Sequence, residues 1–142
     1  MPFTGNYLTA SFKKQLLEGA HNFASGGNTF KLALYTNAAS LDGSTTTYST
    51  VNEISETGDY VAGGVTLVPL APAVEGTSGV VSFQNATITG GTFTARGGLV
   101  YNADTGASVA VLDFGADRVS TGGNFVVQMP PANATSALIR IL

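Results

Sequence analysis

From residue 29 onward the chain consists of short runs in which apolar and polar residues alternate, and this period of two constrains the fold most. In the run 29–36, Phe30, Leu32 and Leu34 fall on one side of an extended strand, with Tyr35 on the other. Similar strand signals recur at Val65–Leu70, Gly79–Phe83, Ala86–Thr89, Thr92–Arg96, Leu99–Tyr101, Val109–Phe114, Asn124–Met129 and Ser136–Leu142. Residues 48–54 fit either a strand or a loop.

This pattern predicts a mainly β protein, an antiparallel two-sheet β-sandwich, with jelly-roll and immunoglobulin-like connections both left open. Helices do not alternate with the strands, so a parallel sheet is disfavoured. Gly-Gly pairs such as Gly97-Gly98 separate the runs and are interpreted as turns or bulges. Pro69 and Pro72 place their segment at a sheet edge, because proline cannot donate to a strand ladder.

One α-helix is predicted at the N-terminus, over residues 7–24, with Asn6 as its N-cap. Leu8, Phe12, Leu16 and Ala20 follow the i, i+4 spacing of an apolar helical stripe. A lone helix of this length is marginal in water, so the stripe is expected to pack against the sheet.

The composition limits the class of protein. The 142 residues suggest a single domain over 1–142, and only 11% are charged, with a net charge of -3. Six Lys and Arg residues disfavour a nucleic-acid partner, and no run is long and apolar enough for a spanning helix. No signal peptide is expected at the start of the sequence. The chain has no cysteine, which excludes disulfides and thiolate chemistry.

Catalytic and metal-binding motifs are not recognisable, and we expect neither an enzyme nor a cofactor or metal site. The nucleophile-elbow and phosphate-loop patterns are both missing from the sequence. The single histidine, His21, is interpreted as a surface residue at the end of the helix. Carboxylates cluster at Glu53, Glu56 and Asp59, and we interpret them as exposed loop side chains.

The low charge indicates a surface made for contact. Few ions need to lose water when such a surface is covered, so copies of the chain or a larger assembly are expected partners. No Lys or Arg lies between Lys31 and Arg96, which favours docking to a charged surface. The apolar end, residues 137–142, is expected to be buried as an inner strand or in an interface.

Several segments together resemble a family of small virion structural proteins of tailed bacteriophages. The resemblance follows the chain in order and covers nearly all of it. The matching segments are Phe12–Gly19, Phe30–Thr36, Asn52–Ile54, Tyr60–Gly64, Phe93–Asn102, Ala110–Gly115 and Gly122–Gln128.

The resemblance implies a non-enzymatic virion protein made in the bacterial host cytoplasm. We expect a head decoration, or cement, protein that binds outside the capsid and stabilises contacts between major capsid subunits. A homo-oligomer, with a trimer as one form, would follow from the lattice. The candidate interface or structural contacts are Phe12, Leu16, Tyr35, Arg96, Tyr101 and Arg140.

Arg96 and Arg140 are predicted to anchor partner carboxylates, although Arg96 fits a contact within the fold equally well. Two alternatives remain open. One is a tail, collar or head–tail structural component. The other is a carbohydrate- or receptor-binding module in which Tyr48, Tyr60 and Tyr101 form exposed stacking platforms.

Overall fold

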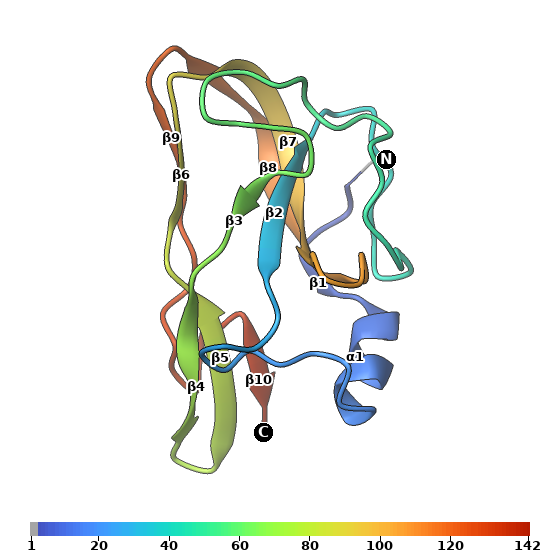
Figure 1. The fold of residues 1–142 in the computed structure, drawn as a ribbon, viewed down its shortest axis with the longest axis vertical. Coiled ribbons are helices and arrows are strands. Elements are labelled where there is room, and N and C mark those ends of the chain that lie inside the picture. The colour runs from blue at the N-terminus through green and yellow to red at the C-terminus, as the bar shows by residue number, and fades with distance from the viewer. Residues whose placement is uncertain (1–2) are drawn as a thin grey trace.

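The computed structural model describes residues 3–142 and shows a mainly β fold with antiparallel sheets and one short helix (Figure 1). The predicted fold class is therefore confirmed. The elements are β1 (Tyr7–Leu8), α1 (Ala10–Leu17), β2 (Phe30–Tyr35), β3 (Val65–Thr66), β4 (Pro69–Glu75), β5 (Ser78–Phe83), β6 (Ala86–Thr89), β7 (Thr92–Asn102), β8 (Ser108–Thr121), β9 (Asn124–Val127) and β10 (Ile139–Ile141).

The first layer is a five-stranded sheet in the order β1-β8-β7-β2-β3. Strand β2 lies inside this sheet and pairs with β7 from Phe30, opposite Asn102, to Tyr35, opposite Gly97. Its side chains alternate between the two faces of the sheet as predicted, since Phe30, Leu32 and Leu34 lie in the main core and Tyr35 lies in a second core. Both faces of this sheet are therefore covered.

The second layer consists of two smaller sheets, β10-β5-β4 and β6-β9, which Figure 1 places beside the first layer. The main core contains side chains of both layers, including Val100 and Val109 from the first and Phe83, Ile88 and Val127 from the second. Apolar burial between the layers is the dominant favourable contribution to such a fold. Strand β4 is an edge strand, as its two prolines predict.

The helix is shorter than predicted and starts later. Instead of spanning 7–24, it covers Ala10–Leu17, because residues 7 and 8 are extended and pair with β8. Thr9, not Asn6, is the N-cap, and its hydroxyl accepts a hydrogen bond from Phe12 N. Gly19, at φ +75°, ends the helix in the left-handed conformation that favours glycine.

His21 is buried, so its interpretation as a surface histidine was wrong. It lies after the helix in the connection to β2, and its side chain is held between Gln15 and Asn102. The sequence pattern did not reveal this because Asn102 is distant along the chain.

Strands β7 and β8 are longer than their sequence signals. Thr92–Arg96 and Leu99–Tyr101 belong to one strand, and the Gly97-Gly98 pair is not a turn. A Cβ at Gly97 would lie 2.4 Å from Leu112 O, so glycine here permits a close approach of the backbones. Ala95 pairs with Arg118 and Gly97 pairs with Asp113, so the four residues 114–117 of β8 lie opposite the single residue Arg96 of β7. This irregularity is a bulge in β8.

The loop of residues 36–64 covers the outer face of the five-stranded sheet, seen as the green and teal trace in Figure 1. Leu41 from this loop packs in the second core with Phe3, Tyr35, Leu99 and Val111. The undecided segment 48–54 belongs to this loop and makes one isolated bridge to β2.

The C-terminal segment only partly matches its prediction. Strand β10 is an edge strand that pairs with β5, and Ile139 is buried. Ile141 and Leu142 are exposed to 59% and 88%, so the apolar end is not buried within this chain.

Candidate functional site

Three strand edges lie on the same side of the sandwich without a partner strand in residues 3–142. Strand β1 covers β8 only at Ala110 and Val111, so β8 has no outer neighbour from residue 112 onward. Strand β9 pairs only with β6, and β10 pairs only with β5. Unpaired edges offer backbone N–H and C=O groups to another chain.

A continuous groove, here called the edge groove, follows these strand edges. It is lined by residues 6–8, 110–114, 117–119, 125–131, 136–138 and Arg140. One part, of about 290 Å³, lies between β1 and β10, and a larger part, of about 1340 Å³, lies between β8 and residues 125–138. The two parts share lining residues, among them Leu112, Leu138 and Arg140, and therefore form one surface.

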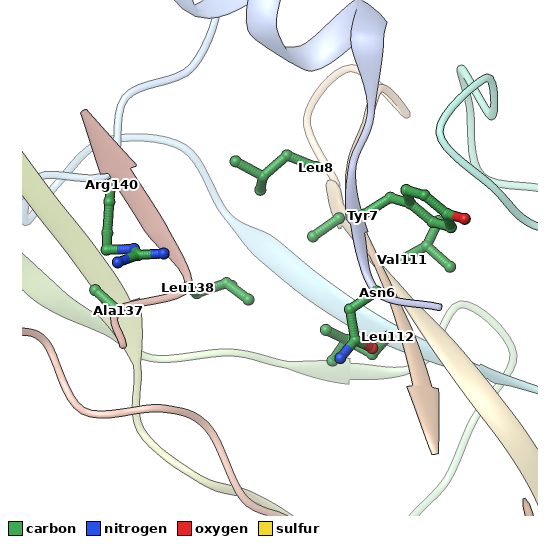
Figure 2. A pocket seen from close by; sticks show the side chains of 9 residues that line it. Asn6, Tyr7, Leu8, Val111, Leu112, Ala137, Leu138 and Arg140 are labelled. Carbon is green, nitrogen blue, oxygen red and sulfur yellow. The ribbon is translucent and has the colours of Figure 1, made fainter. Parts of the chain in front are cut away.

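The walls of the edge groove combine apolar and polar side chains, and its charged residues are Asp113, Asp117, Arg118 and Arg140. Figure 2 shows Leu8 and Leu138 projecting from the two walls into the space between β1 and β10. Leu112, Phe114 and Phe125 are partly buried against the main core and line the groove from inside. The groove thus opens onto one side of the main core, which is a typical setting for a protein contact.

Two exposed valines continue this apolar surface to its rim. Val119 on β8 is 68% exposed and Val126 on β9 is 48% exposed. Although β8 and β9 belong to different sheets, both valines line the larger part of the edge groove. They can be covered together by one partner surface.

Two arginines at the groove rim are anchored through backbone oxygens. Arg118 donates to Phe114 O at 3.1 Å, and Arg140 donates to the carbonyl oxygens of Ala134 and Thr135 at 3.2 and 2.8 Å. Among residues 3–142 neither arginine forms an ion pair. Their positions are fixed while their charges stay available for a carboxylate of a partner.

The six predicted contact residues are not brought together. Phe12 and Tyr35 are fully buried, Tyr101 is buried, and Leu16 packs at the margin of the main core. These four have structural contacts inside the fold. Only Arg140 reaches the edge groove.

Arg96 makes its contact within the chain. Its Nη1 lies 2.7 Å from Asp113 Oδ1, and both side chains are only 13% exposed. The guanidinium also lies over the Phe3 ring, 6.0 Å from its centroid. Arg96 therefore joins β7 to β8 across the bulge and does not present a free charge.

A tyrosine cluster around Glu53 fastens the loop 36–64 to the sheet. Tyr60 donates to Glu53 Oε2 at 2.6 Å, Tyr48 donates to Oε1, and Gly63 N donates to Oε2 at 2.8 Å. The Tyr60 hydroxyl also accepts from Leu34 N at 2.8 Å. Glu53 is thus engaged by internal donors and is not the free loop carboxylate that the sequence suggested.

Burial of these phenols, and then their hydrogen bonds to Glu53, stabilise the protonated form. Burial raises the pKa of Tyr60 and of Tyr48 well above the ordinary value, and their hydrogen bonds to Glu53 raise it further. The arrangement is a set of hydrogen-bond donors around a carboxylate, and its chemistry is structural.

The tyrosines do not form the exposed platform proposed for a carbohydrate-binding module. Tyr60 is fully buried and Tyr101 is 5% exposed. Tyr48 stacks on Tyr101 at a centroid distance of 4.6 Å, which occupies one of its faces. The prediction that these three tyrosines are exposed was wrong, because the loop that carries Tyr48 and Tyr60 folds back onto the sheet.

Sequence reasoning missed most of the edge groove. Arg118 and Val119 fell after the predicted end of the 109–114 strand, because the bulge residues 114–117 interrupt the alternation. The run Arg118–Thr121 lies directly before the Gly122-Gly123 pair, and this position before a predicted turn could have extended the strand.

Within residues 3–142 no group of three or more His, Cys, Asp or Glu side chains is placed to hold a metal ion. No helix in the described part of the chain is long and apolar enough to cross a membrane. Comparisons of the chain with protein-family models, curated proteins and solved structures found no match. The resemblance of the sequence to phage virion proteins therefore stays a prediction.

Proposed function

We propose that this chain is a structural protein of a bacteriophage virion, a decoration protein that binds the outside of the head. It contacts major capsid subunits and copies of itself, and it has no catalytic role. The observation that carries the proposal is the edge groove, where a surface of mixed apolar and polar side chains, open to one side of the core, is bordered by three unpaired strand edges.

Covering this groove is favourable for simple reasons. Apolar area removed from water contributes about 25 cal/mol per Å². Val119 and Val126 carry no charge, so burying these two side chains desolvates no ion, whereas Asp117, Arg118 and Arg140 on the same surface require partners of opposite charge when they are covered. Arg118 and Arg140 then fix the orientation of the partner at the rim, as charged groups do in many interfaces.

The proposed action is mechanical. A decoration protein seated over a junction of capsid subunits makes contacts with several of them at once, and packaged DNA presses outward on the same junction. Each added contact raises the free energy needed to separate the subunits. Because many copies act on one shell, modest affinity at each site is sufficient.

The first test locates and counts the chain in purified particles of the phage that encodes it. Heads and tails are separated, and quantitative mass spectrometry gives the copies of the chain per particle. Hundreds of copies that stay with emptied heads support the proposal. A few copies that stay with tails assign it to the tail or collar instead, and absence from both fractions overturns a virion role.

The second test asks whether the edge groove makes the contact. Val119→Lys places a charge on the groove rim, and we expect it to abolish binding to heads that lack the protein. Val51→Lys is the matched control, since Val51 is 69% exposed, against 68% for Val119, and lies in the loop 36–64 outside the groove. Equal binding by the two variants would exclude the groove as the contact surface.

A further inference from the structure

The connection between α1 and β2 carries a histidine inside an aromatic cluster. His21 is 7% exposed, and its ring centroid lies 5.0 Å from that of Phe12, 6.2 Å from Phe30 and 6.5 Å from Phe23. Phe12 belongs to α1 and Phe30 to β2, so the imidazole packs where the helix meets the sandwich. His21 is the single histidine of the chain.

Hydrogen bonds specify which ring nitrogen carries the proton. Nε2 lies 2.9 Å from Gln15 Oε1, which can only accept, so Nε2 donates. Nδ1 lies 3.1 Å from Asn102 Nδ2, which can only donate, so Nδ1 accepts. The Asn102 amide cannot turn over freely, because its Oδ1 already accepts a hydrogen bond from Asp104 N at 3.0 Å.

None of the charged groups on the elements that pack around His21 is hydrogen-bonded to its ring in the described residues. They are Lys13 and Lys14 on α1, Glu18 at its C-cap, Lys31 on β2, and Asp104 after β7. Lys14 pairs with Glu18 at 2.9 Å, and Asp104 accepts hydrogen bonds from Asn28 and Thr29. In the described part of the chain, no carboxylate is hydrogen-bonded to His21 to stabilise an imidazolium.

We propose that His21 is an acid-sensitive latch that holds α1 and residues 20–28 on the sandwich, and that protonation of Nδ1 releases this segment while the sheets stay folded. A protonated Nδ1 would direct its N–H at the amide donors of Asn102. The charge would also be confined among three phenylalanine rings. Release removes both costs, and it goes beyond the proposed virion role.

The pH dependence follows from the direction of the shift. Burial lowers the pKa of His21 below its ordinary value of about 6.5, so the closed form binds fewer protons than the released form. The latch is at full strength above about pH 6.5 and weakens as the pH falls from there toward the lowered pKa. In that window the equilibrium constant for release rises as the pH falls, by at most about tenfold for each pH unit, because one proton is taken up.

Amide hydrogen exchange of the full chain between pH 7 and pH 5, corrected for the intrinsic rates, tests the latch. We expect residues 10–28 to lose protection as the pH falls, by no more than about tenfold for each pH unit, while β2, β7 and β8 keep theirs. His21→Gln, which cannot take up a proton, is expected to show no such dependence. Parallel loss in wild type and His21→Gln would overturn the proposal, as would unchanged protection in wild type.

A second variant keeps the test decisive if His21→Gln does not fold. Asn102→Asp supplies a carboxylate that accepts from a protonated Nδ1, so the variant should hold the segment closed at pH 5. NMR titration of the ring should give it a higher histidine pKa than wild type. An acid-induced release equal to that of wild type would contradict the latch.

Discussion

Replacing Tyr60 by phenylalanine removes one hydroxyl that serves two partners at once. The hydroxyl accepts from Leu34 N at 2.8 Å and donates to Glu53 Oε2 at 2.6 Å, and the residue is fully buried. Tyr60→Phe leaves a buried backbone N–H without an acceptor, which costs about 1–3 kcal/mol. It also takes a charge-assisted donor from the carboxylate, worth about 1.5–3 kcal/mol.

Together these losses predict that Tyr60→Phe lowers the free energy of unfolding by about 2.5–6 kcal/mol. Tyr48→Phe is the matched control, because Tyr48 donates to the same carboxylate but accepts nothing from the backbone and is only half-buried. It should cost about 1–2 kcal/mol. Urea unfolding with a common slope measures both. If Tyr60→Phe costs no more than Tyr48→Phe, the double role of the Tyr60 hydroxyl is refuted.

Three further substitutions test other parts of the fold by the same unfolding measurement. Arg96→Met leaves the 13% exposed Asp113 carboxylate without its partner and should lower the free energy of unfolding by about 3 kcal/mol. Adding Asp113→Asn to the same chain should restore part of this loss, and no recovery would contradict the pairing. Gly64→Ala places a Cβ 1.9 Å from a backbone oxygen at φ +93° and should cost about 4 kcal/mol or more, whereas Gly79→Ala, in open space, should be nearly neutral; similar losses would argue against the clash. Thr9→Ala should cost about 1–2 kcal/mol through the lost N-cap, and Thr9→Ser should retain most of the stability; equal losses would discount the cap.

The fold class was predictable because alternation reports directly on strands. Residues 30–35 show this most clearly, since the predicted sides of the strand enter two different cores. The start of the helix was not predictable from its apolar stripe. Leu8 fits that stripe, but Tyr7 and Leu8 pair with β8 instead, and only the distant partner strand decides this.

The candidate site was less accessible from the sequence. Of the predicted contact residues, Arg140 reaches the edge groove, while Arg96 is taken by Asp113. A sequence shows that an arginine is present but does not show which carboxylate lies beside it. The groove itself is formed by edges of three sheets, and its walls come from segments as distant as residues 6–8 and 125–138.

The strand order of the five-stranded sheet also determines when it can be completed. Tyr7 pairs with Val111, and Phe30 pairs with Asn102, so both N-terminal strands need partners from the last third of the chain. During synthesis these first strands leave the ribosome long before β7 and β8 exist. The β7–β8 hairpin is local and can form as soon as it emerges, whereas closing the sheet around it requires long loops to be ordered. Folding of this sheet is therefore expected to wait until β7 and β8 have been synthesised, with β1 among the last strands to be placed.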